Sequence, residues 1–264
     1  LINTHHIATD GMSSNLLRRE LHTAYSALVA GESPRLPELA VQYSDYARWQ
    51  REWLSADGGA ERERQLSYWR DRLAGAPLGL DLPTDRPRPA VQSHAGGTVE
   101  CCVDSATVGP LRALASSSGV SLFSCLMAAW CMVLSRHSGS KDVVVGTPFT
   151  GRDNAAVHPL LGYFVNVLPL RVDLAEHPTF VGLIRHVQSL VLGAMDHANV
   201  PFQEIVDALK TPRDPSYTPV FQSFLSMAAE ADQTVSLCTT HSRVVSIASR
   251  VPKFWSSLLC SECS

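Results

Sequence analysis

Several features that mark common classes of protein are missing from this sequence. No apolar run reaches the ~18 residues that suggest a membrane-spanning helix, so we expect no membrane partner. A strong charge of one sign is missing too, since 22 basic residues are balanced by 25 acidic ones and the basic residues are scattered. A nucleic-acid partner usually requires a basic stripe, and this composition argues against one. With 45% hydrophobic and 18% charged residues, the chain has the composition of a soluble globular protein.

No signal peptide is visible and the first residue is not methionine, so we expect a cytoplasmic protein and a fragment of a longer chain. The seven cysteines show neither a zinc-type spacing nor a recognisable nucleophile motif. Their odd number indicates reduced residues of a cytosolic protein. The four that lie in apolar runs, and are expected in the core, are Cys101, Cys102, Cys125 and Cys131.

The most informative stretch lies near the amino end and has the sequence Thr4-His5-His6-Ile7-Ala8-Thr9-Asp10-Gly11. A neutral imidazole titrates near pH ~6.5 and accepts a proton at neutral pH, as attack by an amine or alcohol on an acyl group requires. His6 is the better candidate for this general base. Asp10 either accepts a ring proton or pairs with an arginine and holds the loop. Gly11 is expected to permit a backbone angle or a close approach that a side chain forbids.

Two other interpretations of this stretch have to be weighed. A His-His-x-x-x-Asp string in an arbitrary soluble protein is most often only a loop. Histidine and aspartate are also metal ligands, but adjacent side chains rarely converge on one ion, and we expect no bound metal. The motifs that accompany the stretch favour the catalytic interpretation.

Four further motifs follow the histidine loop in the order known from one protein family. They are Tyr43–Gln50 (Tyr-Ser-Asp-Tyr-Ala-Arg-Trp-Gln), Gly162–Asn166 (Gly-Tyr-Phe-Val-Asn) continuing to Arg171, His197–Phe202 (His-Ala-Asn-Val-Pro-Phe), and Arg213–Ser216 (Arg-Asp-Pro-Ser) with Pro219. In these motifs the chain resembles the condensation domains of nonribosomal peptide synthetases, members of the chloramphenicol acetyltransferase-like superfamily. The resemblance runs from Leu1 to about Met227.

This resemblance implies a fold and a reaction. Condensation domains have an α/β (α+β sandwich) fold, a pseudo-dimer of two lobes with the active loop at their interface. Peptidyl carrier domains dock on both sides, and each delivers a thioester on a phosphopantetheine arm, so no cofactor is bound directly. The acceptor's amine attacks the donor's thioester carbonyl and forms a peptide bond. The implied partners are upstream and downstream carrier domains and an adenylation domain in the same parent polypeptide.

The resemblance also implies roles for individual residues. The positions that match the family's active-site motif are His5, His6, Asp10 and Gly11. The positions expected to support the substrate channel or the structure are Arg152, Asn166 and Arg171. His6 matches the catalytic histidine, which takes the proton of the amine or positions the amine. Asp10 is expected to be structural and bonded to an arginine, and the sequence leaves both Arg152 and Arg171 open as its partner.

Other functions of the wider superfamily are partly separable on these residues. Heterocyclising relatives replace both histidines by aspartates, so His5 and His6 favour peptide bond formation. Epimerising relatives carry a different segment in place of Phe164–Asn166. A stand-alone acyltransferase that uses acyl-coenzyme A stays open as an alternative, as does an inactive truncated remnant or docking platform.

The domain organisation is inferred from composition together with the resemblance. Leu82–Pro89 holds three prolines in eight positions, which predicts an extended connector over residues 82–95. Residues 1–81 are expected to be the C-terminal part of the first lobe, and residues 96–227 an incomplete second lobe. Residues 228–264 are expected to be a divergent tail, non-native or disordered. Because the family's domain begins well before its histidine loop, the first lobe is expected to be truncated and the fragment alone inactive.

Apolar spacing predicts the elements. The expected helices run from Ser13 or Ser14 to near Gly31, over Tyr43–Leu54, Glu61–Leu73, Val108–Ser116, Leu122–His137 and Phe180–Val191, and onward from Pro201. The expected strands are Gly96–Val103, Val143–Gly146 and Leu168–Val172. The inward positions expected on the helix Leu122–His137 are Leu122, Leu126, Trp130 and Val133. This alternation predicts helices packed against a mixed sheet.

Overall fold

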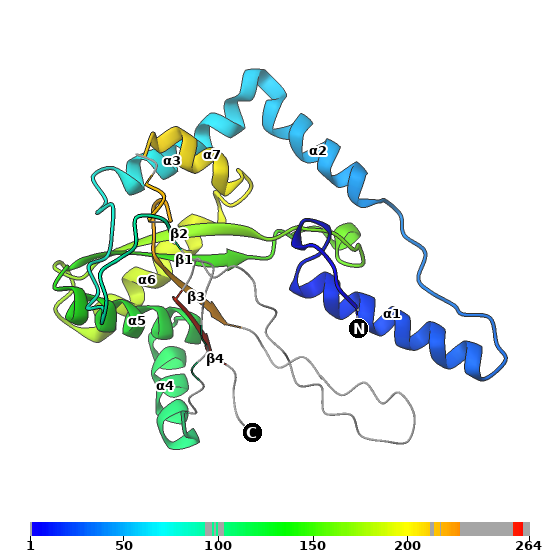
Figure 1. Cartoon of the computed structure of the whole chain (residues 1–264), viewed down its shortest axis with the longest axis horizontal. Coiled ribbons are helices and arrows are strands. Elements are labelled where there is room, and N and C mark those ends of the chain that lie inside the picture. The colour runs from blue at the N-terminus through cyan, green and yellow to red at the C-terminus, as the bar shows by residue number, and fades with distance from the viewer. Residues whose placement is uncertain are drawn as a thin grey trace. The chain divides into compact units, whose positions relative to one another are not determined.

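The computed structural model describes residues 2–92, 97, 99, 103–211, 214–216 and 218–227, and the backbone of residues 256–260. Figure 1 shows its helices and strands in chain order. The chain divides into two compact units. The described residues of the first unit fall within Leu1–Glu63 and Thr150–Asn166, and those of the second within Arg64–Phe149, Val167–Ala229 and Ala248–Ser264.

The first long helix, α1 (Gly11–Val29), follows a short 3₁₀ turn, η1 (His6–Ala8). Its N-cap is Asp10, whose Oδ1 accepts a hydrogen bond from the N–H of Ser13 at 2.7 Å. The expected start at a capping Ser13 or Ser14 is therefore wrong, because the carboxylate of Asp10 already satisfies the free N–H of Ser13. The predicted end is confirmed, since Gly31 follows the last turn with a left-handed φ of +75°.

The apolar side chains that share one face of α1 are not buried among the described residues. Leu21 is 50% exposed, Tyr25 46% and Leu28 64%. Periodicity therefore located the helix correctly but not the surface that would cover it.

Two further helices confirm their predicted ranges. Helix α2 (Tyr43–Ser55) begins with a reciprocal capping box between Gln42 and Asp45. A 3₁₀ turn, η2 (Ala56–Gly59), leads into α3 (Ala60–Leu73). The buried apolar side chains of α3 are Leu66, Trp69 and Leu73.

A four-stranded sheet forms the centre of the second unit, in the order β2-β1-β3-β4 (Figure 1). The strands are β1 (Asp142–Phe149), β2 (Asn166–Asp173), β3 (Ser223–Met227) and β4 (Ser256–Cys260). Strand β3 pairs in parallel with β1 and with β4. The predicted strands Val143–Gly146 and Leu168–Val172 are confirmed, and the apolar run of β1 is buried throughout.

Helices α4 (Ser105–Ser118), α5 (Leu122–Ser138), α6 (Phe180–Met195) and α7 (Phe202–Leu209) complete the second unit. Their apolar residues join those of the sheet in one core. Pro201 caps α7, close to the predicted start. The α/β class is therefore confirmed, with helices packed against a small sheet.

The predicted inward face of α5 is only partly confirmed, because Trp130 packs against the core whereas Val133 does not. Val133 is 46% exposed, whereas Cys131 and Leu134 are buried. The buried side of this helix is rich in small residues, so the helix lies close to its neighbour α6. Ser124 lies on that buried side, where its hydroxyl donates to Oε1 of Gln188 in α6 at 2.9 Å. A prediction that weights large apolar side chains misses such a face.

The cysteines of α5 have no catalytic character. Cys125 and Cys131 are fully buried, as predicted for core residues. Burial raises the pKa of the Cys131 thiol to about 12, which keeps it protonated and unreactive. Cys101 and Cys102 lie outside the described residues.

Parts of the predicted organisation stay predictions. Residues 82–92 contain no helix or strand, as expected of a connector. The predicted strand Gly96–Val103 lies outside the described residues except for Gly97, Val99 and Val103, and so does the tail 228–264 apart from the backbone of β4. The assignment of lobes and of their boundary is not tested by these observations.

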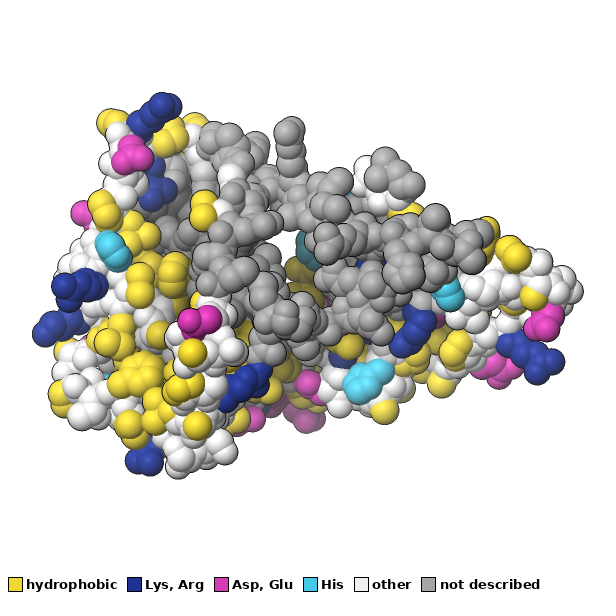
Figure 2. All heavy atoms as spheres, turned by 90° about the horizontal axis from the view of Figure 1, so that it is seen from below, with side chains coloured by type: hydrophobic (Ala, Val, Ile, Leu, Met, Phe, Trp, Pro, Cys, Tyr) yellow, Lys and Arg dark blue, Asp and Glu magenta, His cyan; other side chains and the backbone are white. Residues whose placement is uncertain are grey.

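The apolar length of the helices and the distribution of charge on the surface can be compared with the composition. Within the described ranges no single helix is long and apolar enough to span a membrane, although α4 and α5 together pass that test as a pair bent by 111°. On the face shown in Figure 2, the basic side chains are scattered among acidic and apolar ones.

The corrected face of α5 is testable with two adjacent residues. Leu134→Ala should lower the free energy of unfolding by about 2–5 kcal/mol, because it leaves a cavity in the core. Val133→Ala should change it by less than about 0.5 kcal/mol, because that side chain is exposed. Equilibrium urea unfolding followed by circular dichroism measures both. Equal losses for the two variants would contradict the structure.

Candidate active site

The histidine loop fixes the proton positions of His6. The imidazole Nδ1 of His6 lies 2.7 Å from the carbonyl oxygen of Thr9. A carbonyl oxygen only accepts, so Nδ1 carries the hydrogen, and the neutral ring presents Nε2 as its acceptor. His5 has a different, structural role. Its Nδ1 accepts a hydrogen bond from the N–H of Ile7 at 3.0 Å and so caps the 3₁₀ turn η1. Of the two rings, His6 therefore has the tautomer that a general base requires.

Asp10 is occupied by backbone and arginine contacts. It is 2% exposed, and its Oδ2 accepts from the N–H of Phe164 at 3.0 Å. The Nη2 of Arg152 lies 3.4 Å from Oδ1. Burial alone would raise the pKa of Asp10. The hydrogen bonds from Ser13 and Phe164, together with the Arg152 charge, outweigh burial and hold that pKa below its ordinary value.

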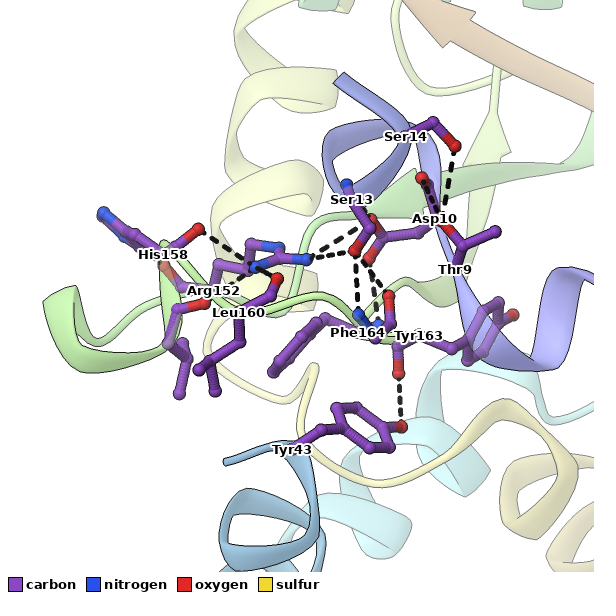
Figure 3. Close-up of polar contacts among 12 residues, drawn as sticks. Thr9, Asp10, Ser13, Ser14, Tyr43, Arg152, His158, Leu160, Tyr163 and Phe164 are labelled. Carbon is purple, nitrogen blue, oxygen red and sulfur yellow. Dashed lines mark hydrogen bonds and ion pairs between the residues drawn. The ribbon is translucent and has the colours of Figure 1, made fainter. Parts of the chain in front are cut away.

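Arg152 connects this carboxylate to a loop distant in sequence. It is 4% exposed, and its Nη2 donates to the hydroxyl of Ser13 at 2.7 Å. Its Nη1 donates to the carbonyl oxygens of Val157 at 2.7 Å, His158 at 3.2 Å and Leu160 at 2.9 Å. The 3₁₀ turn η3 (Ala155–Val157) lies within this loop. A planar guanidinium with five donors is suited to such a role, and Figure 3 shows it between the loop and α1.

The structure thus distinguishes the two arginines that the sequence left open. Arg152 contacts Asp10, whereas Arg171 lies in β2 and its Nη2 is 2.8 Å from Oδ2 of Asp142. Asn166 is the first residue of β2. Its expected part in a substrate channel stays a prediction.

The expectation for Gly11 is wrong in the described chain. Gly11 is the first residue of α1 and is not among the residues with positive φ. A Cβ at Gly11 would meet no atom within 4 Å. Neither a special backbone angle nor a close approach of the described residues accounts for this glycine.

Sequence reasoning missed two residues that shape the site. The hydroxyl of Ser13, which is fully buried, donates to the carbonyl oxygen of Gly162 at 2.7 Å and accepts from its N–H at 3.0 Å. The hydroxyl of Tyr43 donates to the carbonyl oxygen of Tyr163 at 2.7 Å. The available signal for Ser13 was its position three residues after Asp10, on the same face of the helix. No comparable signal existed for Tyr43.

A small apolar cluster lies beside these polar contacts. It consists of Val157, Leu160 and Phe164, with Val41, Tyr43 and Tyr46 packed against it. The ring centres of Tyr46 and Phe164 lie 4.7 Å apart. Tyr43 and Tyr46 therefore pack against this small core, whereas Trp49 is 53% exposed. Among the described residues no group of three or more His, Cys, Asp or Glu residues could hold a metal ion.

Comparison with known proteins gives a consistent result. A family model described as condensation domain matches residues 1–254, which extends past Met227, the expected end of the resemblance. The chain is 43% identical over 237 residues to malpinin synthetase of Mortierella alpina, and this match covers 90% of this chain and 3% of that protein.

Solved structures agree with these sequence matches. The chain is similar to the X-domain from teicoplanin biosynthesis, solved as a complex with OxyB, with a TM-score of 0.78 and 34% identity over 86% of this chain and 50% of that one. It is also similar to a four-domain nonribosomal peptide synthetase bound to AMP and glycine, with a TM-score of 0.76 and 28% identity over 85% of this chain and 16% of that one. The chain therefore spans only part of each relative.

The buried ion pair generates a stability prediction. Asp10→Asn keeps a cap acceptor but leaves Arg152 without its carboxylate, which should lower the free energy of unfolding by about 3–5 kcal/mol at pH 7. The matched control is Asp104→Asn, since Asp104 also caps a helix but is exposed, and it should change little.

Acid should reduce the difference between wild type and Asp10→Asn. A lowered pKa contributes stability that is complete above the unfolded pKa of ~3.9 and is lost as pH falls through the folded pKa. Chemical unfolding at several pH values measures this. A difference that stays constant at lower pH would contradict the ionised state of Asp10.

Two glycines of the site should respond in opposite ways to alanine. A Cβ at Gly162 would lie 2.2 Å from the ring of Tyr43, so Gly162→Ala should cost about 1–3 kcal/mol. Gly11→Ala should be neutral or stabilise by up to about 1 kcal/mol, because it restricts only the unfolded chain. Thermal melts compare the two, and a large loss for Gly11→Ala would refute the geometry at the start of α1.

Proposed function

This chain belongs to the condensation domain family, and from that premise we propose that it forms amide bonds in nonribosomal peptide biosynthesis. The donor is a carrier-bound aminoacyl or peptidyl thioester, and the acceptor is a carrier-bound aminoacyl group. The observation that carries the proposal is the fixed tautomer of His6, whose Nδ1 donates to Thr9.

In the proposed reaction one imidazole takes up a proton and returns it. The amine nitrogen of the acceptor attacks the carbonyl carbon of the donor thioester, so a C–N bond forms and the C–S bond breaks. Nε2 of His6 takes the proton that the amine loses, and the imidazolium returns it to the leaving thiolate. Carrier domains would present both groups on phosphopantetheine arms, as in the family.

Positioning is expected to contribute more than proton transfer. Holding two reactants in a productive orientation gains up to ~7–11 kcal/mol, whereas general-base help of 10²–10⁴-fold corresponds to ~3–5 kcal/mol. His6 is exposed and accessible to a reacting amine, while the ionised Asp10 is buried and structural. An Asp10 substitution should then act through folding rather than through chemistry.

A docking platform is the second candidate function. It is favoured by the likeness to the X-domain, which was solved as a complex with another protein, OxyB. The exposed His6, with Nε2 as its acceptor, favours catalysis over this alternative. An acyltransferase that uses acyl-coenzyme A would be recognised by turnover without carrier domains.

The catalytic assignment is testable in a complete condensation domain supplied with loaded donor and acceptor carriers. His6→Ala should lower product formation by about 10²-fold or more, because the reaction loses its proton acceptor, with little change in the melting temperature. The control His5→Ala removes the cap of the turn and should act mainly through folding. Mass spectrometry of single-turnover reactions measures the product. Equal turnover of wild type and His6→Ala would refute the assignment, and turnover with acyl-coenzyme A would support the acyltransferase.

A further inference from the structure

Three successive residues, Gly162, Tyr163 and Phe164, have their backbone held by side chains of α1, of its N-cap and of α2 (Figure 3). We call these contacts the backbone clamp; they join Ser13 to Gly162, Tyr43 to Tyr163, and the N-cap Asp10 to Phe164. All the distances lie between 2.7 and 3.0 Å. A loop segment held at every residue has little freedom to move its side chains as a group.

The clamp places two rings on opposite sides of the segment. Phe164 is 5% exposed and belongs to the small apolar cluster, where the guanidinium of Arg152 lies 4.0 Å from the centre of its ring. The ring of Tyr163 points away from that of Phe164 in Figure 3 and is 37% exposed. The sequence offered no reason to single out Tyr163, because it fills a variable position of its motif.

Tyr163 contacts the proposed base. Its ring centre lies 5.3 Å from that of His6, with the two planes at 84°. Aromatic rings at this separation and angle attract each other beyond the effect of the apolar area they bury. His6 is otherwise exposed, with the Thr9 carbonyl on its Nδ1 side. The tyrosine ring supplies a second, differently directed contact, and two such contacts define a ring orientation that one leaves free.

Tyr163 does not compete with His6 for a proton. Burial, and to a smaller extent the negative charge of Asp10, raise the pKa of the Tyr163 phenol above its ordinary value. The phenol is therefore neutral wherever the imidazole is a useful base.

We propose that Tyr163 is a positioning residue that holds the imidazole of His6 in its reactive orientation, and that the backbone clamp fixes Tyr163 for this purpose. The proposal deepens the proposed function and rests on it, since the reactive orientation matters only if Nε2 of His6 takes part in the reaction. The ring performs the task, and the hydroxyl of Tyr163 is not needed.

The contact itself is tested without any activity, by nuclear magnetic resonance on the whole chain with labelled histidine. The ring signals of His6 are assigned by their loss in His6→Gln. Tyr163→Leu removes the aromatic ring and should shift these signals, whereas Tyr163→Phe keeps the ring and should leave them in place. Tyr43→Phe removes one contact of the clamp and should shift them by a smaller amount.

Tyr46→Leu is the matched control, because Tyr46 belongs to the same aromatic cluster through Tyr43 and Phe164. It should leave the His6 signals unchanged. Equal shifts for Tyr46→Leu and Tyr163→Leu would overturn the proposal, since they would report a general loosening of the cluster. Unchanged signals in Tyr163→Leu would overturn it as well.

The consequence for catalysis is tested in the complete domain with loaded carriers. Tyr163→Leu should lower kcat by about 10- to 100-fold, with the KM for the acceptor carrier unchanged, because a misplaced group loses orientation and not binding. Tyr163→Phe keeps the aromatic ring and should have the kcat of the wild type. A loss in both variants would assign the effect to the hydroxyl and overturn a positioning role for the ring. Full activity of Tyr163→Leu would overturn it too if His6→Ala is inactive. Full activity of His6→Ala would instead refute the proposed function, while the resonance experiment still decides the contact.

Discussion

The buried contact of Arg152 with the start of α1 is the constraint on which the site depends. A guanidinium that is 4% exposed is stable only if its donors are satisfied and its charge is balanced. Three carbonyl oxygens of one loop, the hydroxyl of Ser13 and the carboxylate of Asp10 meet most of that need. Because Asp10 is also the N-cap of α1, one ion pair sets both where the helix begins and where the loop lies.

This arrangement separates the structural charge of Asp10 from His6, the proposed base. The hydrogen bonds to Asp10 and the charge of Arg152 lower its pKa, so Asp10 stays ionised near neutral pH and does not transfer protons there. His6 is exposed, and its tautomer is fixed by a backbone carbonyl rather than by a carboxylate. The aspartate of the motif therefore influences the histidine through the backbone. Asp10 accepts a hydrogen bond from the N–H of Phe164. It therefore helps to hold the neighbouring Tyr163, whose ring contacts that of His6.

Local sequence signals predicted the elements and the chemistry of the loop. Apolar spacing located α2, α3, α6 and the buried strand β1, because periodicity follows from helix and strand geometry alone. The five motifs identified the family, and with it the histidine that is proposed to act as base. These predictions needed no knowledge of which segments meet, since each depends on residues close together in the chain.

Contacts between distant segments were decided only by the tertiary structure. The sequence offered both Arg152 and Arg171 to Asp10, and the choice depends on the loop Thr150–Asn166 lying against α1 in one compact unit. The inward face of α5 followed small residues and a buried serine, because close packing against α6 outweighs side-chain hydrophobicity there. Tyr43 and Tyr163 gained their contacts from residues far away in the sequence. The sequence by itself thus determined the helices, the strands β1 and β2, and the histidine that is proposed to act as base, but not the strands β3 and β4. Only the packing of distant segments decided what holds that histidine, because burial and hydrogen-bond partners are properties of the folded chain.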